Sequence, residues 1–155
     1  MTDRIALHER AAYGLPVGAR DVSPLGVVAK DKLFCVTLPV PPSLNNAYKN
    51  VKRGGRVLTK TAKDYKEFAK KRIEALARIG MFQCPADARF ALSLKLYFSS
   101  NHRRDVSNCA KLPEDALSEV LGFDDCRVDR LLVERGEIDK ENPRCEITLE
   151  VLCDD

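Results

Sequence analysis

The strongest constraint on the fold is a nine-residue stretch, 90–98, in which large apolar residues alternate with other residues. The apolar positions are Phe90, Leu92, Leu94, Leu96 and Phe98. Successive side chains of a β-strand point to opposite faces, so this period of two predicts a strand with one buried face. The chain is therefore expected to contain a sheet that packs one face against other elements.

Further strands are predicted from β-branched and apolar residues at 33–38, 127–137 and 144–152, the last two joined by a hairpin turn over 139–143. The segment 52–56 contains two glycines and predicts the tip of a small hairpin that returns through residues 57 and 58. The segment before it, 42–48, is rich in Pro and Asn and predicts a loop.

Two main helices are expected. Apolar residues spaced by three and four predict a helix over 62–79, with Thr61 as its N-cap and Gly80 after its end. A second helix is expected to start at the N-cap Ser107, to bend at Pro113 and to end near Leu121.

The order of these elements predicts an α/β (α+β) fold, a mixed β-sheet with two main helices. A length of 155 residues favours one domain, which we place at 33–155. Residues 1–32 have no clear period and contain several Gly and Pro, so we expect a loosely ordered N-terminal extension there.

Charge is unevenly distributed along the chain. Residues 49–78 hold eleven Lys or Arg and three Asp or Glu, a local net charge of +8. Residues 112–155 hold five Lys or Arg and fourteen Asp or Glu, a local net charge of −9. A dense basic segment is typical of a protein that binds a polyanion, although a solvated helix face explains it equally well. Carboxylates beside such a segment repel phosphate unless a divalent cation lies between them, which points to a metal-dependent nuclease.

Composition argues against several other classes of protein. No apolar run approaches the roughly 20 residues of a membrane-spanning helix, and residues 1–20 lack the apolar stretch of a secretory signal, so we expect a cytoplasmic protein. The six cysteines form no C-x-x-C pair, and neither histidine lies near a cysteine pair, which argues against a zinc site. A cysteine-nucleophile enzyme is a further alternative, but no motif joins a Cys to a His.

A candidate catalytic cluster surrounds the second predicted helix. A helical wheel places Lys111 and Asp115 on one stripe, while Asp105 precedes the helix and Asp124 and Asp125 follow it. If both helix ends return to one sheet edge, these carboxylates meet and suit Mg²⁺ or Mn²⁺. The alternative interpretation is ordinary: Asp105 is a cap, Asp124 and Asp125 are turn residues, and Lys111 and Asp115 form an exposed ion pair.

Several segments resemble the RusA family of Holliday-junction resolvases. The segment 104–117, RDVSNCAKLPEDAL, followed by GFDD at 122–125, is similar to the family pattern, roughly R-D-x-D-N-x-x-K-x-x-x-D-A-L and a later D-D. The segments PPSLNNAY at 41–48 and LTKTAKDY at 58–65 are similar to the family's N-terminal part. The resemblance spans residues 33–152.

The resemblance implies a homodimeric, Mg²⁺-dependent endonuclease that resolves four-way DNA junctions in recombination and repair, often in a phage or prophage, with Mn²⁺ as a possible substitute. By matched position it implies catalytic roles for Asp105, Asp125 and Lys111, and metal binding by Asp105 and Asp125 with Asp124 beside it. Asp115 is a further candidate metal ligand. The DNA-binding residues expected from the basic segments and from this resemblance are Asn45, Lys52, Arg53, Arg56, Lys60, Lys63, Lys66, Lys70, Lys71, Arg103 and Arg104.

One position departs from the family pattern. Ser107 stands where the pattern has its second Asp, and a hydroxyl is a poorer metal ligand than a carboxylate. Three consequences remain open: Asp115 or Glu114 substitutes as a ligand, the site binds metal weakly, or activity is lost. The last of these leads to the alternative function, a non-catalytic protein that binds branched DNA.

Overall fold

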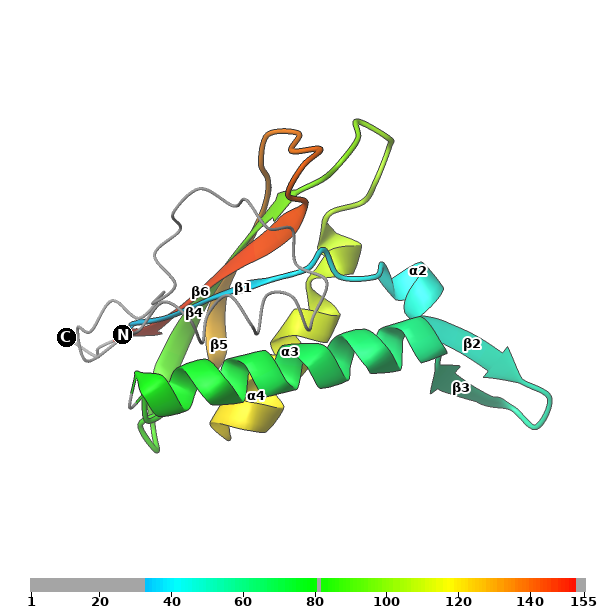
Figure 1. Ribbon diagram of the computed structural model, residues 1–155. Helices are drawn as coiled ribbons and strands as arrows, with labels where there is room; N and C mark the ends of the chain where they lie inside the picture. The colour runs from blue at the N-terminus through cyan, green and yellow to red at the C-terminus, as the bar shows by residue number, and fades with distance from the viewer. Residues whose placement is uncertain (1–32, 81, 153–155) are drawn as a thin grey trace.

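The computed structural model describes residues 33–80 and 82–152, and its ribbon is shown in Figure 1. The N-terminal extension predicted at residues 1–32 lies outside the described residues, as do Met81 and residues 153–155. No helix in the described part of the chain is long and apolar enough to cross a membrane.

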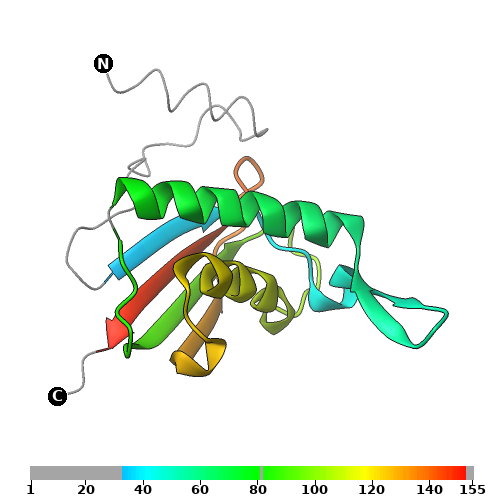
Figure 2. The same ribbon diagram turned by 90° about the horizontal axis from the view of Figure 1, so that it is seen from below.

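The centre of the fold is a four-stranded sheet in the order β1-β6-β4-β5. Its strands are β1 (Leu33–Leu38), β4 (Arg89–Tyr97), β5 (Val128–Arg135) and β6 (Arg144–Leu152). β6 lies antiparallel to both β1 and β4, whereas β5 runs parallel to β4. The long helices α3 (Lys60–Ile79) and α4 (Lys111–Leu121) lie against one face of this sheet (Figures 1 and 2). The predicted mixed α/β fold is therefore confirmed.

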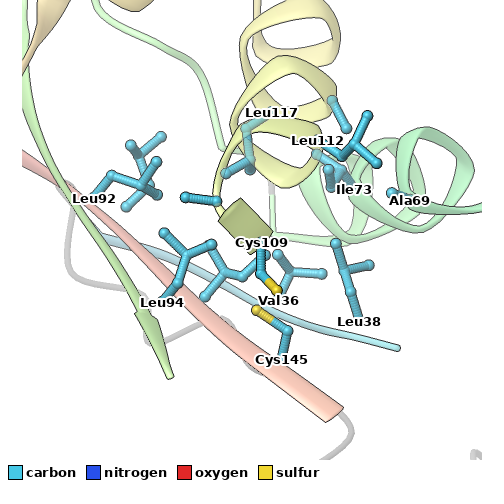
Figure 3. Packing of buried hydrophobic residues seen from close by; sticks show 14 of the residues in the cluster. Val36, Leu38, Ala69, Ile73, Leu92, Leu94, Cys109, Leu112, Leu117 and Cys145 are labelled. Carbon is cyan, nitrogen blue, oxygen red and sulfur yellow. The ribbon is translucent and has the colours of Figure 1, made fainter. Parts of the chain in front are cut away.

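The core lies between that face of the sheet and the two helices. The apolar residues of β4 that alternate in the sequence, from Phe90 to Leu96, are all buried, and so are Phe34, Val36 and Leu38 of β1. The helices contribute Ile73 and Leu117, among others, to the same cluster (Figure 3). The strand predicted from strict alternation is thus confirmed, and its apolar face is buried as a period of two requires. It lies between β6 and β5 in the sheet.

The connection between β5 and β6 was predicted wrongly. These strands do not form a hairpin, since β5 pairs with β4 and β6 inserts between β1 and β4. β4, α4 and β5 instead form a β-α-β unit, in which the helix carries the chain back to start a parallel neighbour. Alternation within a strand shows which side chains are buried, but it does not identify the neighbouring strand.

The basic segment folds into a hairpin and the start of α3. The hairpin strands are β2 (Tyr48–Val51) and β3 (Gly55–Leu58), and Gly54 at the turn has a φ of 79°, which favours glycine. Residues 42–48 are not all loop, because Leu44–Ala47 form the short helix α2. The N-cap of α3 is Thr59, not Thr61: its hydroxyl accepts a hydrogen bond from the Ala62 N–H at 3.3 Å. Gly80 follows the last helical residue, as predicted.

The second predicted helix is divided into two pieces. Residues Ser107–Cys109 form a 3₁₀ turn, η1, and α4 begins only at Lys111, with Ala110 as its N-cap. Ser107 is therefore not a helix cap, and Pro113 lies in the first turn of α4. Proline removes no helical hydrogen bond at that place, because the first four N–H groups have no partner within the helix, so the bend predicted there has no cause. Gly122, with a φ of 74°, ends the helix.

Candidate active site

The candidate active site is centred on the side chain of Lys111, at the first turn of α4. Its Nζ lies 2.9 Å from Asp115 Oδ1, one helical turn later, and 2.7 Å from Asp125 Oδ2. Glu114 Oε2 lies 3.7 Å from the same nitrogen. Asp125 reaches this point because Gly122 turns the chain at the end of α4 and the 3₁₀ turn η2 (Asp125–Arg127) follows. Three carboxylates thus converge on one ammonium group.

The charges of this group stabilise one another. The hydrogen bonds that Lys111 donates to Asp115 and Asp125 raise its pKa well above the usual value, so Lys111 is a cation at neutral pH. The hydrogen bond from Lys111 lowers the pKa of Asp125. Burial raises the pKa of Glu114, and Lys111 opposes that shift. The arrangement holds a fixed positive charge beside acidic oxygens at a partly exposed surface.

Asp105 forms a second group of polar contacts. Its Oδ1 accepts hydrogen bonds from the Ser107 N–H at 3.1 Å and from the Ser107 hydroxyl at 2.6 Å. Its Oδ2 accepts from the Asn108 side-chain amide at 3.3 Å. Ser107, which stands where the family pattern has a carboxylate, therefore donates to Asp105. These hydrogen bonds join Ser107 to Asp105 without placing a second negative charge beside the Asp105 carboxylate.

Two arginines fix the loop that carries Asp105. Arg104 donates to the Ser100 carbonyl oxygen at 3.1 Å, and its guanidinium lies over the Phe98 ring at 4.8 Å. Arg135, at the end of β5, donates to the Arg104 carbonyl oxygen at 2.7 Å and lies over the same ring at 5.2 Å. The sequence gives no signal for this role of Arg135, because the contact joins residues that are far apart in the chain. Arg104, predicted to bind DNA, has this structural role in the fold.

Asp124 behaves as a turn residue. Its carboxylate accepts a hydrogen bond from the Cys126 N–H at 3.1 Å and so caps η2. Asp125 accepts from Lys111 and therefore belongs to the candidate site. The two adjacent acids of the sequence motif thus have different contacts.

The donor atoms suit a hard divalent cation, but their arrangement does not form a metal site. Carboxylate oxygens are the ligands that Mg²⁺ prefers. In residues 33–80 and 82–152, however, no three Asp, Glu, His or Cys side chains are grouped so that they could hold a metal ion. Lys111 occupies the point where Glu114, Asp115 and Asp125 converge.

The basic residues predicted to bind DNA divide into two sets. Lys66 and Lys70 of α3 both form ion pairs with Glu119 of α4, at 2.7 Å for Lys70, and Lys71 pairs with Glu67 at 2.8 Å. The remaining basic residues on the hairpin and at the start of α3 are exposed and form no ion pair within the described residues; they are Lys52, Arg53, Arg56, Lys60 and Lys63. Asn45 is exposed on α2, next to the hairpin, and Arg103 is exposed in the loop before Asp105.

The cysteines described by the structure do not resemble nucleophiles. Cys35, Cys84, Cys109, Cys126 and Cys145 are free thiols. Burial raises the pKa of Cys84 and Cys109, and raises that of Cys145 to about 12, whereas a reactive cysteine needs a lowered pKa. The burial of Cys109 and Cys145 supports the simpler interpretation for these two residues, in which cysteine acts as a small apolar residue.

Comparison with known proteins agrees with these motifs. A family model described as Endodeoxyribonuclease RusA matches residues 39–150, which is well over half of the chain. The matched region includes the hairpin, α3, the Asp105 loop and the Lys111 group. A search of curated proteins found no match. Nucleases of this family depend in general on a divalent metal.

Proposed function

Because the chain belongs to the RusA family of endodeoxyribonucleases, which resolve Holliday junctions, we propose that it cuts four-way DNA junctions by paired, symmetrical nicks. The proposal includes Mg²⁺ as the metal, with Mn²⁺ as a substitute, a homodimer as the active form and a phage or prophage origin. The observation that carries it is the contact of Lys111 with Asp115 and Asp125, residues that the family motif also aligns.

Lys111 has a defined part in this proposal. Cleavage of a phosphodiester puts extra negative charge on the phosphate oxygens in the transition state, and a fixed cation nearby stabilises that charge. Asp115 and Asp125 hold the Lys111 ammonium in place from two elements, α4 and η2. They also raise its pKa, so the cation persists at alkaline pH.

Asp105 and Asp125 are the proposed catalytic carboxylates, and Asp105, Asp115, Asp124 and Asp125 are the proposed metal ligands. All four supply oxygen, as Mg²⁺ prefers. Asp105 lies in the loop before α4, Asp115 lies on α4, and Asp124 and Asp125 lie in the turn that follows it.

The basic hairpin is proposed to hold the DNA arms. β2 and β3 extend away from the sheet, and α3 continues from their base (Figure 1). Lysines and arginines on this extension neutralise phosphates without reading sequence, as a junction-selective protein requires.

The test is Asp105→Asn, assayed for nicking of a synthetic four-way junction across a Mg²⁺ titration. We expect cleavage to fall by on the order of 100-fold or more, because a carboxylate charge at the site is lost. Binding, measured in Ca²⁺, should be kept or strengthened, because one charge that repels phosphate is removed. The matched control is Asp87→Asn, an exposed acid in the loop before β4. Full cleavage by Asp105→Asn would exclude the proposed site.

The second candidate function, non-catalytic binding of branched DNA, is favoured by one observation. Ser107 satisfies Asp105 with two hydrogen bonds in place of the second carboxylate of the family pattern. Under this alternative the unchanged protein binds junctions in Ca²⁺ but does not cut them in Mg²⁺ or Mn²⁺. The same titration therefore separates the two functions.

A further inference from the structure

Strand β5 is an edge strand with apolar residues exposed on both of its faces. It pairs only with β4, and six of its eight residues are exposed. Leu131 is 50% exposed and Leu132 is 51% exposed. Exposed edge strands usually have features that prevent pairing with another chain. Two half-exposed leucines at the centre of β5 therefore indicate that another polypeptide covers this edge.

The backbone hydrogen bonds show which residues of β5 are directed outward. Leu96 of β4 is the register partner of Arg135, and its carbonyl oxygen accepts from the Gly136 N–H at 2.8 Å. In a parallel pair, a residue bonds to the two residues that flank its register partner. Even-numbered residues from 132 onward therefore bond to β4, and Leu131 and Val133 direct their N–H and C=O groups away from the sheet.

This alternation restricts how β5 can pair with a second copy of itself. In an antiparallel pair, outward-directed residues must lie opposite one another. One permitted register places Leu131 opposite Val133 of the second copy and Leu132 opposite the other Leu132, on the two-fold axis. The centre of the strand then forms an apolar seam, to which each copy contributes three residues.

The charges of β5 select that same register. It places Arg130 of each copy opposite Glu134 of the other, on the face of the sheet away from the helices, and it does so twice by symmetry. The next permitted registers on either side place Arg130 and Glu134 opposite apolar residues or glycine. Within the described residues, neither Arg130 nor Glu134 forms an ion pair in its own chain.

From these observations we infer that β5 is the homodimer interface, with two copies joined in an antiparallel pair centred on Leu132 and fixed by reciprocal Arg130–Glu134 pairs. The partner at this edge is a second copy of this chain, because two antiparallel copies of β5 are complementary in their outward-directed backbone groups and in their charges. The two four-stranded sheets form one continuous sheet of eight strands. The inference rests on the homodimer proposed above and specifies its surface.

The test exchanges charges between two variants. Arg130→Glu and Glu134→Arg each place like charges opposite one another in a homodimer, so each alone should weaken self-association about tenfold or more. When the two variants are mixed, each Arg faces a Glu again at both positions, and a heterodimer should form with an affinity close to that of the unchanged protein. Sedimentation velocity measures the affinities, and native mass spectrometry distinguishes the heterodimer from either homodimer.

The control pair is Lys140→Glu and Glu141→Arg, which carries the same changes of charge in the turn between β5 and β6. It should leave self-association unchanged. Single variants that remain dimeric, or a mixture that fails to form a heterodimer, would overturn the β5 interface and leave the nuclease proposal standing. If the unchanged protein is a monomer at micromolar concentration, both the interface and the homodimer are excluded. Junction cleavage is assayed separately, so a loss of activity alone does not count against the interface.

Discussion

At the scale of single residues, Ser107 is the position where this chain departs from its family. Its hydroxyl and backbone N–H both donate to Asp105, at 2.6 and 3.1 Å, so the loop before α4 is held by hydrogen bonds to one carboxylate. A carboxylate at position 107 cannot donate, and it would bring a second negative charge against the first. Such a pair is stable only with a cation between the two groups.

Ser107→Asp should therefore make stability dependent on metal. Without divalent ions, the unfolding free energy of the variant should be lower than that of the unchanged protein by roughly 1–3 kcal/mol, because a hydrogen bond is removed and like charges meet. The variant should therefore unfold at a lower temperature. Addition of Ca²⁺ or Mg²⁺ should recover more stability in the variant than in the unchanged protein. Thermal melts with and without the ion measure this difference.

The control for that experiment is Ser107→Asn, which removes the hydroxyl without adding charge. It should lose less stability than Ser107→Asp, because no like charges meet, and it should show no added response to the ion. An equal response of Ser107→Asp and the unchanged protein would mean that position 107 does not face a metal site. If the variant also gains junction cleavage, the present site lacks a ligand.

At the scale of elements, α3 and α4 are joined by one acidic residue. Glu119 of α4 pairs with both Lys66 and Lys70 of α3, and these hydrogen bonds lower its pKa. Two lysines that are predicted to bind DNA thus also join the two helices. The sequence shows that these lysines lie off the apolar stripe of α3, but it cannot show which neighbouring helix meets that side.

The ion pairs of Glu119 with Lys66 and Lys70 predict a dependence of stability on pH. The folded-state pKa of Glu119 is lowered, so its contribution is present above the pKa of an unfolded glutamate and is lost as the pH falls through the folded-state value. Glu119→Gln should remove that acid-side component and cost no more than about 1 kcal/mol at neutral pH, since the pair is partly exposed. Chemical denaturation at a series of pH values measures both effects.

The matched control is Glu67→Gln, which removes the exposed pair with Lys71 within α3 alone. This substitution should lower stability less than Glu119→Gln, because the Glu67–Lys71 pair connects α3 to no other element. Equal losses of unfolding free energy from the two variants would show that the pairs of Glu119 between α3 and α4 stabilise the fold no more than a surface pair within one helix.

The hairpin is the element for which DNA binding makes the clearest prediction. Replacement of Lys52, Arg53 and Arg56 by Ala should weaken junction binding and reduce the slope of log affinity against log salt by about 0.9 for each phosphate that is no longer neutralised. Replacement of Lys66 and Lys70 should change that slope less, because both lysines already pair with Glu119, whose charge offsets part of theirs. Binding titrations in Ca²⁺ at several salt concentrations give the slopes. A hairpin variant with an unchanged slope would place the DNA elsewhere.

Much of the fold follows from local sequence patterns. The alternation at 90–98, the two glycines of the hairpin turn, and the glycines after both helices predict β4, the turn and the helix ends correctly. The neighbour of β5 was missed because strand pairing depends on the crossover of the chain and not on any residue within the strand. The start of α4 was missed because Ser107 resembles an N-cap, but its hydroxyl donates to Asp105 instead.

The candidate site was predicted only in part, for a similar reason. Helical spacing places Lys111 beside Asp115, and the structure shows that contact at 2.9 Å. The contact of Lys111 with Asp125 depends on how the chain turns after Gly122, which spacing alone does not specify. The metal-binding roles of the carboxylates stay predictions.

At the scale of the whole molecule, two sites must act on one junction. A four-way junction has two-fold symmetry, and its resolution requires a nick in each of two opposed strands. A dimer built on a two-fold axis supplies one site for each strand. A supercoiled plasmid that extrudes a cruciform reports on this directly: two nicks give linear DNA, and one nick gives an open circle.

A dimer with a single working site should therefore yield open circles. Arg130→Glu in one chain and Glu134→Arg in the other direct the formation of the heterodimer, and Asp105→Asn is added to one of them only. We expect this heterodimer to convert the plasmid to open circles, because each site cuts one strand. The control heterodimer, with Asp105 intact in both chains, should give linear DNA. Linear DNA from the one-site heterodimer, at the rate of the control, would mean that one subunit makes both nicks, and the symmetrical mechanism would be wrong.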